Sequence, residues 1–320
     1  MIEMPAYSPR FLKTLFFGKQ VSPYLDFSIM GLKKSDAALS AVERISVSGV
    51  QEKFPAVIDG GKIRLAREGE RSTHILKPAP WDETIATRRH IPANEHLTMQ
   101  IAAQVYGIET AANGLCVSSD GQLVYITRRF DILSDGTKAE MEDFASVCGR
   151  NEQTDGIHFK YHGTYEDIAR GIRQYVSVWM VDMERFFDLV VFNYIYGNGD
   201  DHLKNFSLIR QGVDYRLAPA YDLLNTSLHV NGDDFGLDGG LSANMFRSDG
   251  YDRTGHPCRE DLEQFASLIG IVPVRAARIL DRYMAIPEET LSLLKSSFLP
   301  EKLQRHYLRI VKERVARFSR

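Results

Sequence analysis

The first part of the chain has short runs in which apolar and β-branched residues partly alternate with polar ones. Five of these runs predict strands, at 44–50, 54–58, 62–65, 73–77 and 123–127. Asp59-Gly60-Gly61 predicts a tight turn between the second and third runs. Apolar residues at four-residue spacing between 94 and 106 predict one helix, which ends at Gly107. The first part is therefore expected to be a small unit of strands with one main helix.

From about residue 141 onward, the apolar spacing is mostly that of helices. A helix is expected over 183–196, with Asp182 as its N-cap, because apolar residues recur there along one face. Two short apolar runs, at 206–209 and 215–218, flank a glycine-containing turn and predict a β-hairpin. The tail from 259 to 320 again has the spacing of helices. This part of the chain is thus expected to be mainly helical.

The two patterns together predict an α+β fold with two lobes. The chain has 320 residues, and at about 150 residues per domain this length suggests two domains. We expect a strand-rich N-lobe over residues 1–130 and a mainly helical C-lobe over residues 131–320.

Charge and cysteine content exclude several classes of protein. The chain has 39 Lys and Arg residues against 42 Asp and Glu residues, a formal net charge of −3. Proteins that bind nucleic acid through bulk charge are normally basic, so no direct nucleic-acid binding is expected. The three cysteines are far apart, which is typical of a reducing compartment. No secretion signal or apolar run of about 20 residues is visible, so a cytoplasmic protein is expected.

The densest group of polar residues, 197–205, follows the expected 183–196 helix and precedes the expected hairpin. Phosphoryl transfer requires a carboxylate that orients the attacking hydroxyl, and an amide oxygen with a second carboxylate to hold magnesium. Asp200 and Asn205 have the five-residue offset that protein kinases use, and Asp222 follows the hairpin. Asp201 would give an offset of four, so Asp200 is favoured. His202 and Lys204 lie between them, where they could approach phosphate oxygens.

Two alternatives to phosphoryl transfer stay open for these residues. Runs of Asn, Gly and Asp are common in polar turns without any chemistry. A metal-dependent hydrolase could use Asp200, His202 and Asp222, because Asp-x-His is also a metal-ligand pattern.

A lysine in the first part favours phosphoryl transfer. Lys77 ends an expected strand and is preceded by the glycine-containing loop 46–53, and kinases place such a loop and a strand lysine on the phosphates. Glu95, near the start of the expected helix, could be the acidic partner of Lys77. An exposed strand lysine, and a glutamate favoured by the helix dipole, are the alternatives.

Five segments, in order along the chain, together resemble the HipA family. They are 45–53, 74–78, 129–131, 199–207 and 217–222. HipA-family proteins are serine/threonine protein kinases that act as toxins of bacterial toxin–antitoxin systems. The resemblance implies a two-lobed protein-kinase-like fold, with the phosphate loop and strand lysine in the N-lobe and the catalytic loop and metal-binding Asp in the C-lobe. It also implies ATP and Mg²⁺ as cofactors.

The resemblance also implies a role for each matching residue. Asp200 would be the catalytic base, and Asn205 and Asp222 would be the magnesium ligands. The implied nucleotide site comprises Ser48, Gly49, Val50, Gln51, Glu52, Lys53, Lys77, Arg128, Arg129, Phe130, His202, Leu203, Lys204, Asn205, Tyr221 and Asp222. Residues 128–130 would be the adenine-contacting hinge, where the family more often has an acidic residue in place of Arg128. Ser46 and Ser48 would be autophosphorylation sites.

One departure from the family concerns the segment before the phosphate loop. Full-length HipA kinases carry roughly a hundred further residues there, whereas this chain has 45 residues before Ser46. It therefore resembles the shorter HipT type of three-gene, HipBST-like systems, in which a small HipS-like chain resembles the missing part and a HipB-like protein binds DNA. The apolar residues between Phe11 and Phe17 are either core or a docking surface for the HipS-like partner.

The resemblance further implies an acceptor. Family members phosphorylate translation components, with aminoacyl-tRNA synthetases as the known substrate class. Two alternatives stay open: a kinase that acts on a small-molecule acceptor, and a non-catalytic subunit of a repressor complex. The presence of Lys77, Asp200, Asn205 and Asp222 argues against the second alternative, because inactive kinases commonly lose one of these residues.

Overall fold

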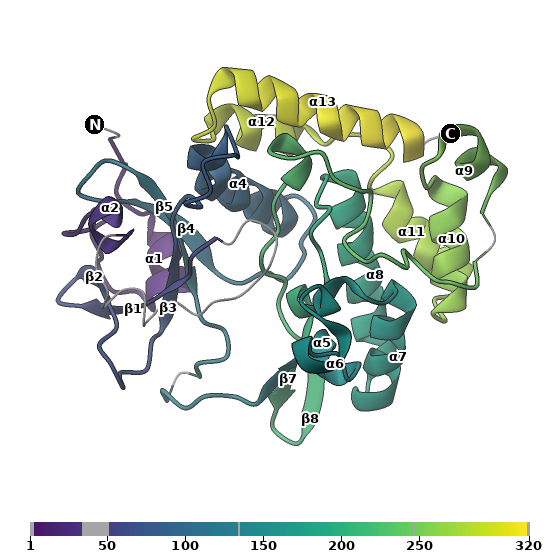
Figure 1. The fold of residues 1–320 in the computed structure, drawn as a ribbon, viewed down its shortest axis with the longest axis horizontal. Coiled ribbons are helices and arrows are strands. Elements are labelled where there is room, and N and C mark those ends of the chain that lie inside the picture. The colour runs from purple at the N-terminus through teal and green to yellow at the C-terminus, as the bar shows by residue number, and fades with distance from the viewer. Residues whose placement is uncertain (1–2, 34–50, 134, 246, 319–320) are drawn as a thin grey trace. The chain divides into compact units, whose positions relative to one another are not determined.

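Five antiparallel strands form the sheet of the first part of the chain, in the order β2-β1-β3-β5-β4 (Figure 1). This computed structural model describes residues 3–33, 51–133, 135–245 and 247–318. The strands are β1 (Phe54–Asp59), β2 (Lys62–Leu65), β3 (His74–Lys77), β4 (Asn113–Val117) and β5 (Leu123–Arg128). Four of them confirm predicted strands, and β4 was not predicted. The strand predicted at 44–50 lies outside the described residues.

Helix α1 (Pro9–Phe16) packs against β4 and β5 and supplies much of the core of this sheet. Its side chains Leu12, Leu15 and Phe16 are buried, and they pack with Phe54 and other apolar residues of the strands. Of the two alternatives for this apolar segment, core is therefore confirmed for these three residues, because the sheet covers them. Phe17, directly after the helix, is 50% exposed. Helix α2 (Ile29–Lys33) follows in the chain.

The chain divides into two compact units. The first contains the described residues of Met1–Leu97 and Ala111–Thr137, and the second those of Thr98–Thr110 and Lys138–Arg320. Helix α4 (Ile91–Gln104), preceded by η1 (Arg88–His90), contributes residues to both units, because the division falls between Leu97 and Thr98. The sequence had suggested a single boundary at residue 130, and that division into lobes stays a prediction.

The second unit is mainly helical, which confirms the predicted α+β class with strands first and helices later. Its other elements are β6 (Met141–Asp143), α5 (Phe144–Val147), α6 (Glu152–Asp155), η2 (Phe159–Tyr161), α7 (Tyr165–Tyr175), α8 (Trp179–Ile195), η3 (Leu203–Asn205), β7 (Ser207–Gln211), β8 (Asp214–Leu217), η4 (Thr226–Leu228), α9 (Asp249–Thr254), α10 (Arg259–Leu268), α11 (Pro273–Asp281), α12 (Glu288–Ser296) and α13 (Glu301–Phe318). Strands β7 and β8 form the predicted hairpin, and β6 extends it to three strands. In the described residues, no helix is both long and apolar enough to cross a membrane.

Helix α8 leads into the polar loop that the sequence singled out. It starts at Trp179, so Asp182 lies within its first turn and the prediction of Asp182 as N-cap is wrong. The carboxylate of Asp182 accepts a hydrogen bond of 2.8 Å from the backbone N–H of Leu217 and pairs with Arg185 at 2.6 Å. This buried residue therefore attaches α8 to the end of β8.

Candidate active site

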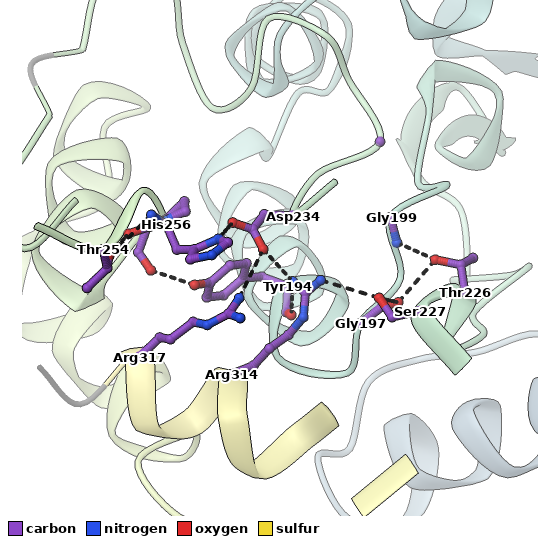
Figure 2. Close-up of polar contacts among 12 residues, drawn as sticks. Tyr194, Gly197, Gly199, Thr226, Ser227, Asp234, Thr254, His256, Arg314 and Arg317 are labelled. Carbon is purple, nitrogen blue, oxygen red and sulfur yellow. Dashed lines mark hydrogen bonds and ion pairs between the residues drawn. The ribbon is translucent and has the colours of Figure 1, made fainter. Parts of the chain in front are cut away.

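The loop between α8 and η3 is held by hydroxyl groups of the η4 helix. The Oγ1 atom of Thr226 accepts a hydrogen bond of 2.8 Å from the backbone N–H of Gly199, and its hydroxyl donates to the carbonyl oxygen of Gly197. The Ser227 hydroxyl donates to the same Gly197 carbonyl at 3.2 Å (Figure 2). The backbone on the N-terminal side of Asp200 is therefore fixed by two side chains that lie more than 25 residues further along the chain.

Asp200 lies at the partly exposed part of this loop. The hydroxyl of Tyr161 donates a 2.7 Å hydrogen bond to its Oδ1 atom. The side-chain amide of Asn205 donates to the backbone carbonyl oxygen of Asp200 at 2.8 Å. Because the amide nitrogen of Asn205 is used in this way, its Oδ1 oxygen is the atom that can bind a metal ion.

The neighbouring Asp201 is buried, and its carboxylate accepts hydrogen bonds inside the second unit. The side-chain amide of Asn193 donates to it at 3.0 Å, and the backbone N–H of Gly236 donates at 2.9 Å. Burial raises the pKa of Asp201 to about 7, and these hydrogen bonds oppose that rise. A side chain at Gly236 would lie 2.5 Å from the backbone nitrogen of Asp201, so glycine permits this close approach. Asp201 therefore links the loop to residue 236, and Asp200 is the more accessible of the two carboxylates.

Asp222 has an unusual backbone conformation. Its φ angle is +58°, in the left-handed region that a residue with a side chain adopts only at a cost. The preceding Tyr221 donates a 2.8 Å hydrogen bond to the carbonyl oxygen of Lys204 and lies 2.6 Å from the hydroxyl of Ser207. Burial raises the pKa of Tyr221, so it remains a neutral donor. Asp222 thus directly follows a residue that is hydrogen-bonded to the 197–205 loop.

The residues between Asp200 and Asn205 face into the second unit. Lys204 pairs with Asp143 at 3.1 Å, and Leu203 is fully buried. The buried ring of His202 meets the Tyr161 ring edge to face, with 5.2 Å between the centroids. In this structure the ammonium of Lys204 is engaged by a carboxylate, so a phosphate contact from Lys204 or His202 stays a prediction.

In the first unit, the lysine at the end of β3 has the acidic partner that the sequence suggested. The Nζ atom of Lys77 lies 2.6 Å from Oε1 of Glu95, and both side chains are almost fully buried. The ammonium also lies 5.3 Å from the centre of the Tyr125 ring. The prediction of an exposed strand lysine is therefore wrong, and the Lys77–Glu95 pair is confirmed.

The described end of the expected phosphate loop is attached to the same strand. Gln51 donates a 3.0 Å hydrogen bond from its side-chain amide to the carbonyl oxygen of Pro78, directly after Lys77. Glu52 is buried and Lys53 is partly exposed. The other expected loop and modification residues, Ser46, Ser48, Gly49 and Val50, lie outside the described residues.

The residues expected at the hinge have partners inside the first unit. The guanidinium of Arg128 lies 4.7 Å from the centre of the Phe17 ring. Arg129 donates two hydrogen bonds to the carboxylate of Asp131, at 3.0 and 2.7 Å, and a third to the hydroxyl of Ser72. Phe130, between Arg129 and Asp131 in sequence, is partly exposed. The Arg129 side chain therefore links Asp131 to Ser72, and its backbone N–H donates to the carbonyl oxygen of Thr73 at 2.9 Å. A nucleotide contact from residues 128–130 stays a prediction.

Helix α13 adds a support that sequence analysis missed. The buried guanidinium of Arg314 donates to the carbonyl oxygen of Tyr194 at 2.9 Å and lies 3.2 Å from Asp234 (Figure 2). The same Asp234 carboxylate lies 2.6 Å from Nδ1 of His256. Asp234 is two residues before Gly236, so α13 is connected to both the end of α8 and the segment that contacts Asp201. No local pattern in the sequence relates these distant residues.

The donors expected for magnesium fit that ion. Within the described part of the chain, no three or more His, Cys, Asp or Glu side chains form a group that could hold a metal ion. The expected ligands are instead one amide oxygen, of Asn205, and one carboxylate, of Asp222. Magnesium prefers such oxygen ligands and usually retains water and substrate phosphates in its remaining positions. The residues present can therefore hold magnesium only with further ligands from outside the protein.

Comparison with known proteins identifies the family. Residues 45–290 match the HipA-like C-terminal domain family. The chain belongs to this family. The match covers the loop that carries Asp200 and Asn205, and it includes Lys77 and Asp222.

Three relatives of this HipA-family chain are named as candidate kinases. Y4mE of Sinorhizobium fredii (strain NBRC 101917 / NGR234) is 31% identical over 191 residues, which are 57% of this chain and 43% of that protein. A Haemophilus influenzae protein (strain ATCC 51907 / DSM 11121 / KW20 / Rd) is 27% identical over 70% of this chain and 64% of its own length. Y4dM of the same Sinorhizobium strain is 34% identical over 60% and 47%. The matched part of the chain thus spans about half the length of these relatives.

Two solved structures share the fold of this HipA-family chain. One is the Shewanella oneidensis MR-1 toxin–antitoxin system of HipA, HipB and its operator DNA, with a TM-score of 0.66 and 20% identity over 86% of this chain and 65% of that chain. The other is the Helicobacter pylori proinflammatory kinase CtkA, with a TM-score of 0.53 and 16% identity over 87% and 93%. These likenesses establish the α+β fold.

Proposed function

We propose that this chain is an ATP- and magnesium-dependent serine/threonine protein kinase. The observation that carries the proposal is the loop at 197–205. It presents a partly exposed carboxylate, Asp200, whose own backbone carbonyl orients the Asn205 amide so that the amide oxygen can bind a metal ion. A carboxylate base and an amide metal ligand at this spacing are the parts that phosphoryl transfer to a hydroxyl requires.

Each proposed residue has a separate task. The Asp200 carboxylate orients the acceptor hydroxyl and accepts its proton. Asn205 and Asp222 hold magnesium, which when bound neutralises charge on the phosphate oxygens. The ammonium of Lys77 binds phosphate, and its ion pair with Glu95 holds that ammonium in place within the first unit. The Gln51–Pro78 hydrogen bond attaches the described end of the phosphate loop to the residue that follows β3.

The test of the proposed chemistry uses the full chain, MgATP and two matched variants. Asp200→Asn should reduce ADP release and phosphate transfer at least a hundredfold, because it removes the base. Asp214→Asn is the control, since exposed Asp214 also accepts a 2.7 Å hydrogen bond from a hydroxyl, that of Ser177, but lies on the β7–β8 hairpin. It should leave both rates unchanged. A wild-type protein that releases no ADP, or an Asp200→Asn variant with full activity, would contradict the proposal.

We further propose that the kinase acts as the toxin of a three-gene, HipT-type toxin–antitoxin system. Family membership and the fold shared with a HipA toxin support this proposal. A small HipS-like chain would neutralise the kinase, and a HipB-like protein would bind DNA. Expression of the chain alone should arrest growth, and co-expression of each neighbouring gene should identify the partner that restores growth. Growth that is unaffected by the active kinase would contradict the toxin role.

The acceptor is proposed to be a protein of translation, such as an aminoacyl-tRNA synthetase. Phosphoproteomics after short expression of the wild type and of Asp200→Asn would identify serine and threonine sites that depend on the active chain. Transfer to a small molecule, without new phosphoproteins, would replace the protein acceptor by a small-molecule acceptor.

Ser46 and Ser48 are proposed autophosphorylation sites. A phosphate adds about −1.5 to −2 charges and would be repelled by the phosphates of ATP. The intact mass of the wild type should show one or two added phosphates after incubation with MgATP, and Asp200→Asn should show none. Replacement of both serines by alanine should remove the added mass. If the doubly substituted chain still gains phosphate, the sites lie elsewhere.

A further inference from the structure

A tyrosine 39 residues before the proposed base is hydrogen-bonded to its carboxylate. The Tyr161 hydroxyl donates to Oδ1 of Asp200 at 2.7 Å, within the range that a general base requires for the proton it handles. No motif considered in the sequence includes Tyr161. Both residues lie in the second unit, so their distance depends on that unit alone.

The ring of Tyr161 is fixed on more than one side. The edge-to-face contact with His202 places the ring against the catalytic loop itself, and the Lys160 ammonium lies 4.7 Å from the ring centre. The backbone is fixed as well, because the carbonyl oxygen of Tyr161 accepts a 3.0 Å hydrogen bond from the N–H of Asp238. The hydroxyl of Tyr161 therefore approaches Asp200 from a side chain with little freedom to move away.

We propose that Tyr161 is a positioning residue for the base: its hydroxyl holds one oxygen of Asp200 so that the carboxylate keeps the orientation needed for the acceptor hydroxyl. This inference rests on the proposed kinase function and adds a residue to it. A carboxylate on a partly exposed loop can otherwise rotate about its side-chain torsions, and each unproductive rotamer lowers the fraction of molecules ready to react. The acceptor remains the proposed serine or threonine hydroxyl, and Tyr161 itself is not phosphorylated.

The alternative is that Tyr161 occupies the place of the acceptor. A hydroxyl at 2.7 Å from a base has the geometry of a substrate, so Tyr161 could block the site or receive phosphate. The positioning role and the blocking role predict opposite changes when the hydroxyl is removed. Loss of a positioning group slows transfer, whereas loss of a blocking group accelerates it.

The test replaces only the hydroxyl, with Tyr161→Phe in the full chain. ADP release from MgATP, with water as the acceptor, should fall about 10- to 100-fold in kcat, the range expected for a hydrogen bond to a charged group. The KM for ATP and the unfolding temperature should stay the same, because the ring and its packing remain. Tyr215→Phe is the matched control, since Tyr215 donates a 3.0 Å hydrogen bond to the Glu140 carboxylate on the three-stranded sheet, away from the catalytic loop. It should match the wild type.

A second comparison distinguishes positioning from a general structural role. In the Asp200→Asn background, Tyr161→Phe should lower the remaining rate less than twofold, because a group that acts through Asp200 has no effect once the base is absent. Equal losses in both backgrounds would overturn the inference. So would a wild-type rate for Tyr161→Phe, a faster rate, or phosphate on Tyr161 in the mass spectrum.

Two different measurements test the proposed function and this inference. The wild-type rate of ADP release tests the kinase function, and its absence would contradict both. The ratio of the Tyr161→Phe rate to the wild-type rate tests the positioning role alone.

Discussion

The ammonium of Lys77 and the carboxylate of Glu95 form a buried ion pair of 2.6 Å within the first unit. Removing one member of such a pair leaves the other without its nearest opposite charge, which costs about 3–5 kcal/mol of stability. We therefore expect both Lys77→Met and Glu95→Gln to lower the stability of the chain and to abolish phosphate transfer. Chemical denaturation and ADP release measure the two effects.

The double variant separates stability from chemistry. Lys77→Met/Glu95→Leu replaces both charges by apolar side chains, so much of the lost stability should return. Transfer should not return, because the proposed phosphate-binding cation is still absent. A stable double variant that transfers phosphate at the wild-type rate would show that Lys77 has no role in the reaction.

Substitution by alanine should lower stability strongly at Asp201 and only weakly at the adjacent Asp200. Asp201→Ala removes the acceptor for the buried donors of Asn193 and Gly236, which should cost about 2 kcal/mol or more. Asp200→Ala should change stability by less than about 1 kcal/mol, since its carboxylate is partly exposed, and should abolish transfer. Urea unfolding of both variants checks the first effect. If the destabilised variant is Asp200→Ala instead, the assignment of base and structural carboxylate is reversed.

Asp222 bears a conformational cost for its left-handed backbone, so glycine and alanine should differ there. The φ angle of +58° disfavours any residue with a Cβ atom by about 1–2 kcal/mol relative to glycine. Asp222→Gly should therefore be more stable than Asp222→Ala by about 1 kcal/mol. Both variants should lose transfer, because the proposed metal ligand is gone. Thermal unfolding without nucleotide gives the comparison. Equal stability of the two variants would indicate that the backbone changes conformation once the carboxylate is removed.

His74, on the same strand as Lys77, should make the protein sensitive to mild acid. Burial lowers the pKa of His74 from 6.5 to about 4, so the unfolded chain binds a proton between these values and the folded chain does not. Stability should be complete above pH 6.5 and decrease as pH falls toward 4, by up to about 3 kcal/mol. Denaturation at several pH values tests this. His74→Gln should reduce the dependence but not remove it, because burial also lowers the pKa of His96 to about 4. The control His158→Gln, at an exposed position, should leave the dependence unchanged.

The elements with strong local signals could be predicted from the sequence. Strands β1, β2, β3 and β5 and the β7–β8 hairpin follow from alternation and glycine turns. Strand β4 was missed because Asn113-Gly114 has the composition of a turn. Gly114 is there for a packing reason, since a Cβ atom would lie 2.9 Å from the Leu15 side chain of α1. That contact joins residues about a hundred positions apart, so no local pattern reveals it.

In the candidate site, too, the sequence reveals some residues and not others. Asp200, Asn205 and Asp222 could be proposed from the sequence because their spacing is the one that protein kinases use, and their roles stay predictions. Tyr161 and Arg314 could not be proposed in this way, because each acts on the loop through a contact that only the folded second unit creates. Asp182 was misplaced as an N-cap for a related reason: its partner, the N–H of Leu217, is 35 residues away.

The contact between Arg314 and the end of α8 also has a consequence for synthesis of the protein. Arg314 donates to the carbonyl oxygen of Tyr194, which the ribosome adds 120 residues earlier. At about 5–20 residues per second, translation of that interval takes roughly 6–24 seconds. During this time the loop that carries Asp200 lacks the arginine that anchors its start. The nascent chain thus carries an unfinished site until α13 has been made and has packed against the loop.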